Sequence, residues 1–258
     1  MIKTLYILWF QGVKTHPYVV KNCILSWKLK NPDWNIILLD NDNIKDYINI
    51  DEYIDTKKIN ITLTGLSDIV RILLLKKYGG LWVDSTTFCN LSLTRWLPTK
   101  IRTGFFAFSK PFGNHLLSSW FLYSEKDNYI ITKLYDEIKI FWTINNQTNN
   151  YYWFHNLFGQ IYKKDIKFRR IWNNTPKISS KNCHRFNINF NKPIKLNEIY
   201  IINSKTEFVY KLTYKYKKLV NNSVFHYLFS TLNPLKKIYM QYMKQMQQMQ
   251  QMQQIKDI

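Results

Sequence analysis

"GLSDIVRILLLKKYGGLWVDSTTF", residues 65–88, joins an apolar helix pattern to a short strand pattern. Asp68 and Arg71 stand at the head of the helix pattern, and a double glycine ends it. The apolar run that follows stops at Asp84. Because glycine after a periodic apolar segment is a typical helix end, we expect a helix, a sharp turn and a buried strand, in that order.

The helix is predicted to span residues 68–78, with Ser67 as its N-cap. On this helix Asp68, Arg71 and Leu75 share one face. One interpretation is purely structural: a carboxylate in the first turn is favoured by the helix dipole and pairs with the arginine three residues later. The other interpretation is that these charges serve a ligand.

The order of the elements favours the second interpretation. A parallel strand ending at Asp84, directly after a helix that presents Asp68 and Arg71, places all three groups at the carboxyl edge of a sheet. Open α/β sheets bind ligands in the crevice outside that edge. Carboxylates there accept hydrogen bonds from sugar hydroxyls or hold a divalent cation, and an arginine lies well against phosphate charge. We therefore expect these side chains to converge on one pocket.

Strand and helix patterns alternate outward from this segment. The apolar runs predict strands over residues 3–10, 34–40 and 103–109, and a helix over 17–29. Repeated βα units with apolar strands indicate an α/β fold, in which a mostly parallel sheet is flanked by helices. Residues 1–110 are expected to form this part of the molecule.

Residues 111–235 are predicted to be mainly helical and to complete a single domain over 1–235. A polar, irregular stretch is expected over 176–205. The helical periodicity covers four segments, 114–125, 129–144, 151–163 and 165–172.

The C-terminal region holds two biased segments. Residues 205–219 alternate basic and aromatic side chains, and 210–216 within them are expected to form an edge strand with one wet face. For the residues beyond 216, attraction to anionic lipid is an open alternative. In residues 236–258 methionine recurs every third position, which drifts around a helix and makes a poor coiled-coil seam. We interpret them as a low-complexity tail.

The charge of the chain points to anionic partners. Of 258 residues, 37 are lysine or arginine and 17 are aspartate or glutamate, so the formal charge is +20. Such a surface attracts nucleic acid, acidic lipid headgroups or phosphorylated small molecules. Because helix-turn-helix, zinc and RNP-like signatures are all missing from the sequence, a specific nucleic-acid partner is not expected.

Cysteine usage and hydropathy bear on the compartment. Cys23, Cys89 and Cys183 are an odd number without C-x-x-C spacing, which argues against a disulfide scaffold and a thiolate zinc site. No segment reaches the ~18 uninterrupted apolar residues of a membrane span. We expect a cytoplasmic protein, with the inner face of the membrane as a place where it could make peripheral contact.

The segment "SDIVRILLLKKYGGLWVD", residues 67–84, resembles a known signature, S-D-x-x-R-x-x-x-L-x-x-x-G-G-x-[WY]-x-D. The signature belongs to a glycosyltransferase group that includes capsular polysaccharide synthesis proteins, Och1-like mannosyltransferases and the glucosyltransferase domain of large clostridial toxins. The resemblance is closer to the capsular branch and covers roughly residues 3–216. It extends through "ILWFQG" (7–12), "CILSWKLKNPDWNIILLD" (23–40), "GFFAFSKP" (104–111), "YYWFHNLF" (151–158) and "YKLTYKY" (210–216).

The resemblance implies a GT-A fold and transfer of a sugar from a nucleoside diphosphate donor to a glycan acceptor, with retention, in capsule or cell-surface polysaccharide synthesis. By position, Trp9 is the aromatic that stacks on the donor base. Asp68 is the carboxylate near the ribose and sugar hydroxyls, and Arg71 is the cation beside the donor sugar and phosphates. Asp84 matches the first aspartate of the D-x-D motif and Thr86 the second. Arg71 and Asp84 are the residues expected to be catalytic.

The metal site is where the sequence departs from its wider relatives. A D-x-D motif holds Mn²⁺ or Mg²⁺, but Thr86 offers only a neutral hydroxyl, a weaker ligand than a carboxylate. The form D-[AS]-T is common in the capsular branch. We expect a divalent cation to bind through Asp84 and the donor phosphates, with little affinity for the protein alone.

Two other interpretations remain open. The chain could be a basic module that binds nucleic acid or a membrane surface through an inert α/β core, or a related fold that lost catalysis through Thr86. The five histidines form no metal-ligand spacing. His155 matches a family position, but a core role is favoured for it, and the Cys183–His184 pair is not expected to bind metal.

Overall fold

The computed structural model describes most of the chain, namely residues 1–215, 220–235 and 237. The low-complexity tail predicted for 236–258 lies outside the described residues, Lys237 excepted. So do residue 216, the last of the expected edge strand, and residues 217–219, for which attraction to anionic lipid was left open.

A sheet forms the centre of the molecule, and its strands are β1 (Thr4–Leu8), β2 (Asn35–Leu39), β3 (Gly80–Val83), β5 (Phe105–Ser109) and β6 (Leu117–Ser124). Within the described part of the chain the strand order is β2-β1-β3-β6-β5. β1 pairs in parallel with β2 and β3, whereas β6 runs antiparallel to β3 and β5. Four strands therefore point the same way, and the predicted α/β fold with a mostly parallel sheet is confirmed.

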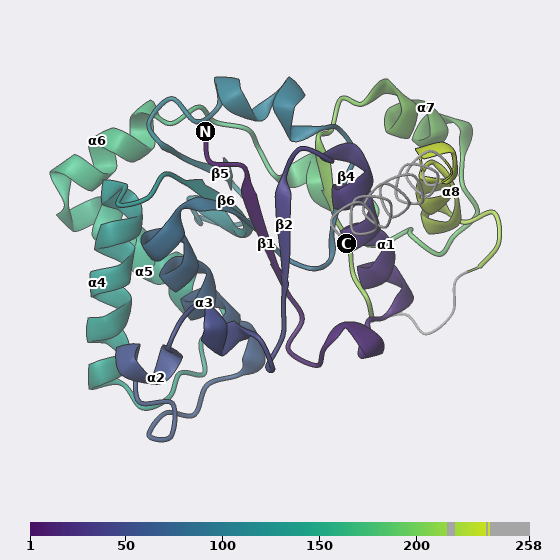
Figure 1. Cartoon of the computed structure of the whole chain (residues 1–258). Helices are drawn as coiled ribbons and strands as arrows, with labels where there is room; N and C mark the ends of the chain where they lie inside the picture. The colour runs from purple at the N-terminus through teal and green to yellow at the C-terminus, as the bar shows by residue number, and fades with distance from the viewer. Residues whose placement is uncertain (216–219, 236, 238–258) are drawn as a thin grey trace, which may run out of the picture.

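Helices cover one face of this sheet, on the left in Figure 1. They are α2 (Ile50–Tyr53), α3 (Leu63–Tyr78), α4 (Tyr129–Ile144), α5 (Trp153–Lys164) and α6 (Ile166–Asn174). Tyr6 and Leu8 of β1 point into the apolar core on this side. Leu5 and Ile7 point into the core on the other side, as the two-residue period of a strand requires.

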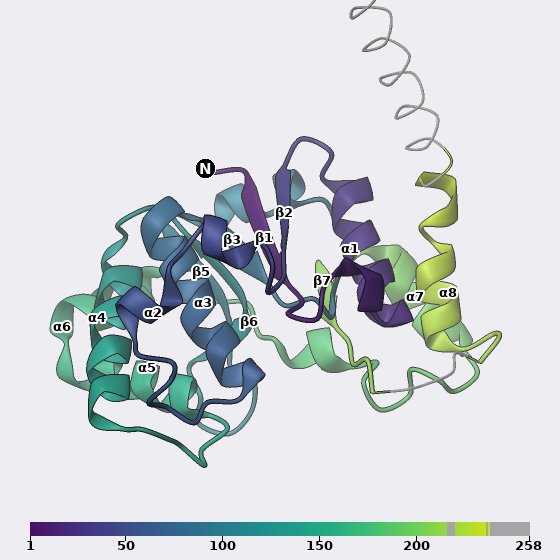
Figure 2. The ribbon, with the colours of Figure 1, turned by 60° about the horizontal axis from the view of Figure 1, so that its bottom comes forward.

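The opposite face carries α1 (Tyr18–Lys30) and a two-stranded ribbon of β4 (Thr87–Cys89) and β7 (Val209–Lys211). Beyond them lie α7 (Leu196–Ser204) and α8 (Val224–Ser230), as Figure 2 shows. α1 holds the ribbon in place, because Trp27 Nε1 donates a hydrogen bond of 2.7 Å to the carbonyl oxygen of Thr87. Short 3-10 helices complete the described chain: η1 (Val13–Thr15), η2 (Ile44–Asp46), η3 (Leu93–Arg95), η4 (Leu97–Thr99) and η5 (Lys181–His184).

The predicted start of α3 at Asp68 is wrong. The helix begins at Leu63, and Thr62 is its N-cap, because the Thr62 side chain accepts a hydrogen bond from the backbone N–H of Gly65. Asp68 therefore lies in the second turn, beyond the reach of the strongest helix-dipole effect. The position of Asp68 is explained by its ion pair with Arg71, at 2.7 Å.

Two further predictions are wrong. The helix expected over 114–125 is the strand β6, in which every residue is buried. A strand with both faces covered shows no alternation, so its apolar run cannot be told from a buried helix by pattern alone. The irregular stretch expected over 176–205 contains α7, which ends that stretch as a helix of nine residues.

Cys23, Cys89 and Cys183 are all buried and all free thiols. Among the described residues, every helix is too short or too polar to cross a membrane.

The double glycine between α3 and β3 fixes how the helix returns to the sheet. Gly79 has φ +68° and Gly80 has φ +107°, which are conformations that residues with a side chain rarely adopt. A Cβ atom on Gly80 would lie 2.6 Å from the carbonyl oxygen of Thr4 on the neighbouring strand. Glycine is therefore favoured at both positions by the positive φ angles. At Gly80 a side chain would also clash with the backbone of the neighbouring strand.

We predict that Gly80→Ala destabilises the protein by at least about 2 kcal/mol, since it combines an unfavourable φ with a backbone clash. The free energy of unfolding, measured by urea denaturation, checks this. Gly159→Ala in α5 is the matched control: a Cβ there meets no atom within 4 Å. It should stabilise the helix by about 0.5 kcal/mol or more. Equal effects of the two substitutions would contradict this account.

Candidate functional site

A hollow of about 460 Å³ lies at the carboxyl ends of β1 and β3. Trp9 follows β1 directly and Asp84 follows β3 directly, so the turn after each parallel strand contributes a side chain. This is the crevice in which open α/β sheets bind ligands. The hollow is lined by Leu8, Trp9, Phe10, Gln11, Leu63, Thr64, Ser67, Trp82, Asp84, Ser85, Thr86, Tyr151, Lys211, Tyr214 and Lys215.

Asp84 receives hydrogen bonds on both of its carboxylate oxygens. Its Oδ1 accepts from Trp82 Nε1 at 3.0 Å and lies 3.4 Å from an Arg71 guanidinium nitrogen. Its Oδ2 accepts from the Lys211 ammonium at 2.9 Å. The side chain is 27% exposed, so it faces the hollow while its partners hold it in one orientation.

Arg71 lies behind Asp84, with only 2% of its surface exposed. Its guanidinium pairs with Asp68 at 2.7 Å and donates to the carbonyl oxygen of Ser119 at 2.8 Å. It also donates to the carbonyl and hydroxyl oxygens of Ser67, at 3.1 and 3.0 Å. These partners compensate the buried charge. In the structure, the Arg71 guanidinium therefore contacts protein groups and acts on the hollow through Asp84.

Burial and neighbouring charges move the two carboxyl groups in opposite directions. Burial raises the pKa of Asp68 to about 6, against the attraction of Arg71, and the nearby Asp84 charge adds to the rise. Burial also opposes ionisation of Asp84, but Lys211 and Arg71 together hold its pKa below the usual value of 3.8. The carboxyl group facing the hollow thus stays ionised to a lower pH than Asp68 does.

Lys211 is the charged partner of Asp84 that the sequence analysis missed. β7 pairs antiparallel with β4 and places Lys211 opposite Thr87. Its ammonium donates to Asp84 Oδ2 at 2.9 Å and to the Thr86 hydroxyl oxygen at 2.6 Å. A signal was present, because "YKLTYKY" (210–216) was expected to form a strand and resembles a family segment. What the sequence could not show is the strand with which it pairs.

Aromatic side chains form another part of the wall. Trp9 is partly buried and meets the Tyr214 ring edge-on, with ring centroids 5.2 Å apart. Tyr214 itself is 46% exposed. Tyr151, which is 69% exposed, lines the hollow from the start of the "YYWFHNLF" segment. These rings offer flat apolar surface beside the charged group of Asp84 and Lys211.

The residues predicted from the sequence thus divide into two groups. Trp9, Asp84 and Thr86 line the hollow. Asp68 and Arg71 are outside its lining and form the layer beneath it, linked to the hollow through Asp84. The expected pairing of Asp68 with Arg71 is present at 2.7 Å, within a larger network than the sequence indicated.

The donor set at Asp84 fits a divalent cation poorly. Within the described part of the chain, no cluster of three or more His, Cys, Asp or Glu side chains could hold a metal ion. Asp84 and Thr86 supply one carboxylate and one hydroxyl, and the Lys211 ammonium already contacts both. Mn²⁺ or Mg²⁺ at Asp84 stays a prediction from the family resemblance.

A core role was expected for His155, and the residue is partly buried. Burial, with a contribution from His115, lowers the pKa of His155 to about 4, so the ring is neutral near pH 7. Its Nδ1 lacks a hydrogen-bond partner among the described residues. Burial also raises the pKa of Cys183 to about 12 and lowers that of His184 to about 4.

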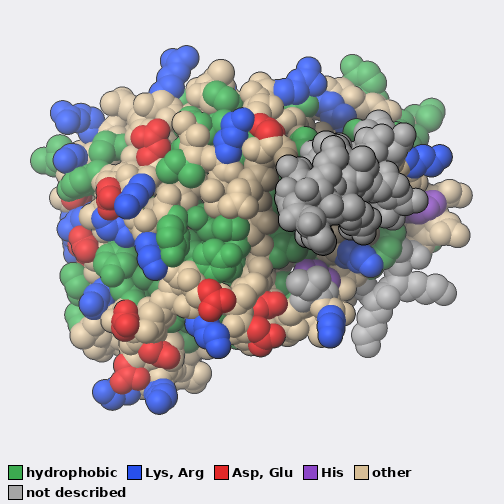
Figure 3. Space-filling view, viewed as in Figure 1, with side chains coloured by type: hydrophobic (Ala, Val, Ile, Leu, Met, Phe, Trp, Pro, Cys, Tyr) green, Lys and Arg blue, Asp and Glu red, His purple; other side chains and the backbone are tan. Residues whose placement is uncertain are grey.

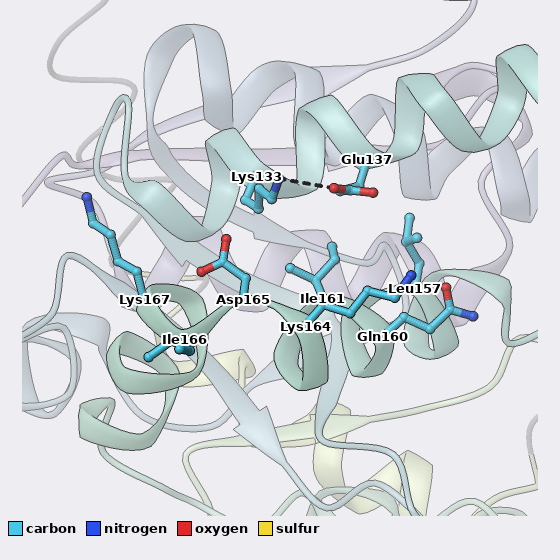
Figure 4. Close-up of a pocket in the computed structure, with 9 residues that line it drawn as sticks. All are labelled: Lys133, Glu137, Leu157, Gln160, Ile161, Lys164, Asp165, Ile166 and Lys167. Carbon is cyan, nitrogen blue, oxygen red and sulfur yellow. Dashed lines mark ion pairs between the residues drawn. The ribbon is translucent and has the colours of Figure 1, made fainter.

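A second hollow lies between α4 and the α5–α6 corner and shares no lining residue with the first. Figure 4 shows the Lys133–Glu137 ion pair at its rim, with N–O distance 3.1 Å. Lys164, Lys167 and Asp165 border it as well. Asp165 is occupied as the N-cap of α6, where it accepts from the Phe168 backbone N–H. This hollow therefore lacks the combination of strand ends, aromatic wall and oriented carboxylate found at Asp84.

The raised pKa of Asp68 predicts a pH dependence of stability. Between the unfolded pKa of 3.8 and the folded pKa of about 6, the folded state holds a proton that the unfolded chain has lost. The contribution of Asp68 to stability is therefore full below pH 3.8 and is lost as the pH rises through 6. Relative to Asp68→Asn, the wild type should lose at most about 3 kcal/mol across this window.

Urea unfolding of both proteins at pH 4, 5, 6 and 7 measures this difference, in which the contributions of the buried histidines cancel. A difference that stays constant with pH would mean that Asp68 ionises like an exposed carboxyl group.

Comparisons with known proteins agree with the resemblance noted in the sequence. Over 98 residues the chain is 31% identical to the O-glycosyltransferase braB of Annulohypoxylon truncatum, covering 33% of this chain and 23% of that protein. The match thus spans less than a quarter of that relative's length.

Two solved structures have a similar chain course. PaToxG glycosyltransferase is 16% identical with a TM-score of 0.49, over 66% of this chain and 72% of that one. The apo-form glycosyltransferase GlyE of Streptococcus pneumoniae TIGR4 is 13% identical with a TM-score of 0.49, over 93% of this chain and 64% of that one.

The family assignment rests on a longer match. The sequence model described as "Capsular polysaccharide synthesis protein" matches residues 1–228, which is most of the 258-residue chain. The protein belongs to the capsular polysaccharide synthesis protein family.

Proposed function

We propose that this protein is a GT-A-type glycosyltransferase that moves a sugar from a nucleoside diphosphate donor to a glycan acceptor. The observation that carries the proposal is the oriented Asp84 carboxylate, held by Lys211 and Arg71 at the carboxyl ends of parallel strands beside an aromatic wall. Family membership supports the same activity. Capsule or cell-surface polysaccharide is the product class that the family description suggests.

The parts of the hollow match the parts of such a donor. Trp9 and Tyr214 supply flat faces for the base, since every nucleobase stacks on aromatic rings. Lys211 and Lys215 supply positive charge for the diphosphate. Asp84 and Ser67 can hydrogen-bond to ribose or sugar hydroxyls.

In the proposed reaction the bond between the anomeric carbon and the diphosphate oxygen breaks, and its electron pair stays on the phosphate. An acceptor hydroxyl oxygen forms the new bond to the same carbon, on the same face for a retaining enzyme, and its proton passes to the departing phosphate oxygen. The protein lowers the barrier mainly by stabilising charge on that leaving group. Arg71 enters as a positioning residue, because it fixes Asp84 from below.

The rival interpretation is a basic binding module, and its natural signature would be a continuous basic patch. On the part of the face that is left visible in Figure 3, lysine and arginine side chains are scattered among acidic and apolar ones. That distribution favours the enzyme over a nucleic-acid module on this face. Peripheral contact with an anionic membrane surface, and a cytoplasmic location, stay predictions.

We predict that a nucleoside diphosphate sugar raises the melting temperature of the protein and that Trp9→Ala removes this stabilisation. Loss of one base–aromatic stack costs about 1–3 kcal/mol of binding. Trp9→Phe keeps an aromatic face and should retain most of the effect. A thermal-shift screen over uridine, guanosine, adenosine and cytidine donors, with and without manganese, provides the measurement.

Tyr200→Ala is the matched control, because Tyr200 is an aromatic residue on α7, 75% exposed and outside the hollow. It should respond to donors like the wild type. The proposed function is wrong if no donor in the panel stabilises the wild type in either buffer.

A further inference from the structure

We propose that the Lys211 ammonium takes the place of a divalent cation at Asp84 and Thr86, so that the donor diphosphate binds without metal. This inference rests on the proposed function and concerns the same hollow. It opposes the expectation of Mn²⁺ or Mg²⁺ at Asp84, so the two make different predictions for one experiment.

The oxygens that a metal would need already have partners. Lys211 Nζ lies 2.9 Å from Asp84 Oδ2 and 2.6 Å from Thr86 Oγ1, between the two side chains that stand at the D-x-D positions. The other carboxylate oxygen accepts from Trp82 at 3.0 Å. A metal ligated by Asp84 Oδ2 would have to share that oxygen with the Lys211 ammonium and lie next to its positive charge.

Backbone pairing places Lys211 at this position. It is the last residue of β7, directly opposite Thr87, and the next residue, Leu212, donates its N–H to the carbonyl oxygen of Thr86 at 2.9 Å. Its side chain is only 18% exposed. Strand pairing on both sides of Lys211 thus fixes its backbone, and Asp84 and Thr86 hold its ammonium.

The charges around Asp84 are already balanced. Two carboxylates, Asp68 and Asp84, face two cations, Arg71 and Lys211, in one connected network. An added divalent cation would lie within a few ångströms of the Lys211 ammonium and repel it. The network as it stands has no net formal negative charge left to hold such an ion.

The ammonium is also suited to the role it would take over. Lysine has three N–H donors, and Asp84 and Thr86 account for two of them. The third is available to a phosphate oxygen in the hollow, where Lys215 adds a second positive charge. Lysine is a common point-charge ligand for phosphate, and a fixed cation stabilises a departing diphosphate without reorganisation.

The test measures binding of uridine, guanosine, adenosine and cytidine diphosphate by calorimetry, first in excess EDTA and then in Mn²⁺. We expect the best of the four to bind in EDTA, with an affinity that Mn²⁺ leaves nearly unchanged. The free Mn²⁺ signal in electron paramagnetic resonance should fall no further with protein and nucleotide than with nucleotide alone. This part uses the unaltered protein and is independent of how any variant folds.

Variants then assign the effect to one side chain. Lys211→Met keeps most of the length of the side chain and removes its charge, and should weaken diphosphate binding roughly 10- to 100-fold, as expected for a lost charged hydrogen bond. Binding of the parent nucleoside should stay unchanged. The control is Lys192→Met, an exposed lysine outside the hollow, which should bind the diphosphate like the wild type.

A double variant tests whether a second carboxylate, in place of the ammonium, makes diphosphate binding require a metal ion. Thr86→Asp with Lys211→Ala restores two carboxylates and removes the ammonium, so its diphosphate binding should become dependent on Mn²⁺. Diphosphate binding by the wild type only in the presence of Mn²⁺ would overturn the Lys211 proposal and leave the glycosyltransferase proposal standing. If no diphosphate binds in either buffer, both are overturned.

Discussion

Four alternating charges, Asp68, Arg71, Asp84 and Lys211, form the network on which the rest of the site depends. Asp68 and Arg71 are almost completely buried, and an ion without its partner in that environment is strongly unfavourable. Each charged side chain therefore needs the oppositely charged neighbour with which it pairs. Together these ion pairs join α3 to the end of β3 and to β7. The geometry of the hollow follows from this requirement, since the outermost carboxylate can take up only one orientation.

Local signals in the sequence were sufficient for much of this arrangement. Apolar runs with turn residues after them predicted β1, β2 and β3, and a strong helical period predicted α4 with its bounds of 129–144. The double glycine required positive φ and marked the turn into β3 correctly. Because Trp9 and Asp84 directly follow parallel strands, the carboxyl edge could be identified before their contacts were known.

Other features depend on contacts that no local pattern reveals. β6 is buried on both faces, so its sequence "LSSWFLYS" carries no alternation to separate strand from helix. The N-cap of α3 was assigned to Ser67 because that residue precedes the charged positions. In the structure the N-cap is Thr62, whose hydroxyl oxygen accepts a hydrogen bond from the backbone N–H of Gly65. Lys211 could be seen only as one basic residue among several, since its meaning comes from the pairing of β7 with β4.

That pairing also bears on how the chain matures on the ribosome. Lys211 and Asp84 are 127 residues apart in the chain, and β4 remains without its partner strand until β7 has been made. Domains form as their segments emerge, N-terminal parts first. The α3–β3 unit can collapse early, but the Asp84 carboxylate then lacks one of its two cations until β7 has been made. A nascent chain that ends before Lys211 can contain α3 and β3, but it lacks the ammonium that pairs with Asp84.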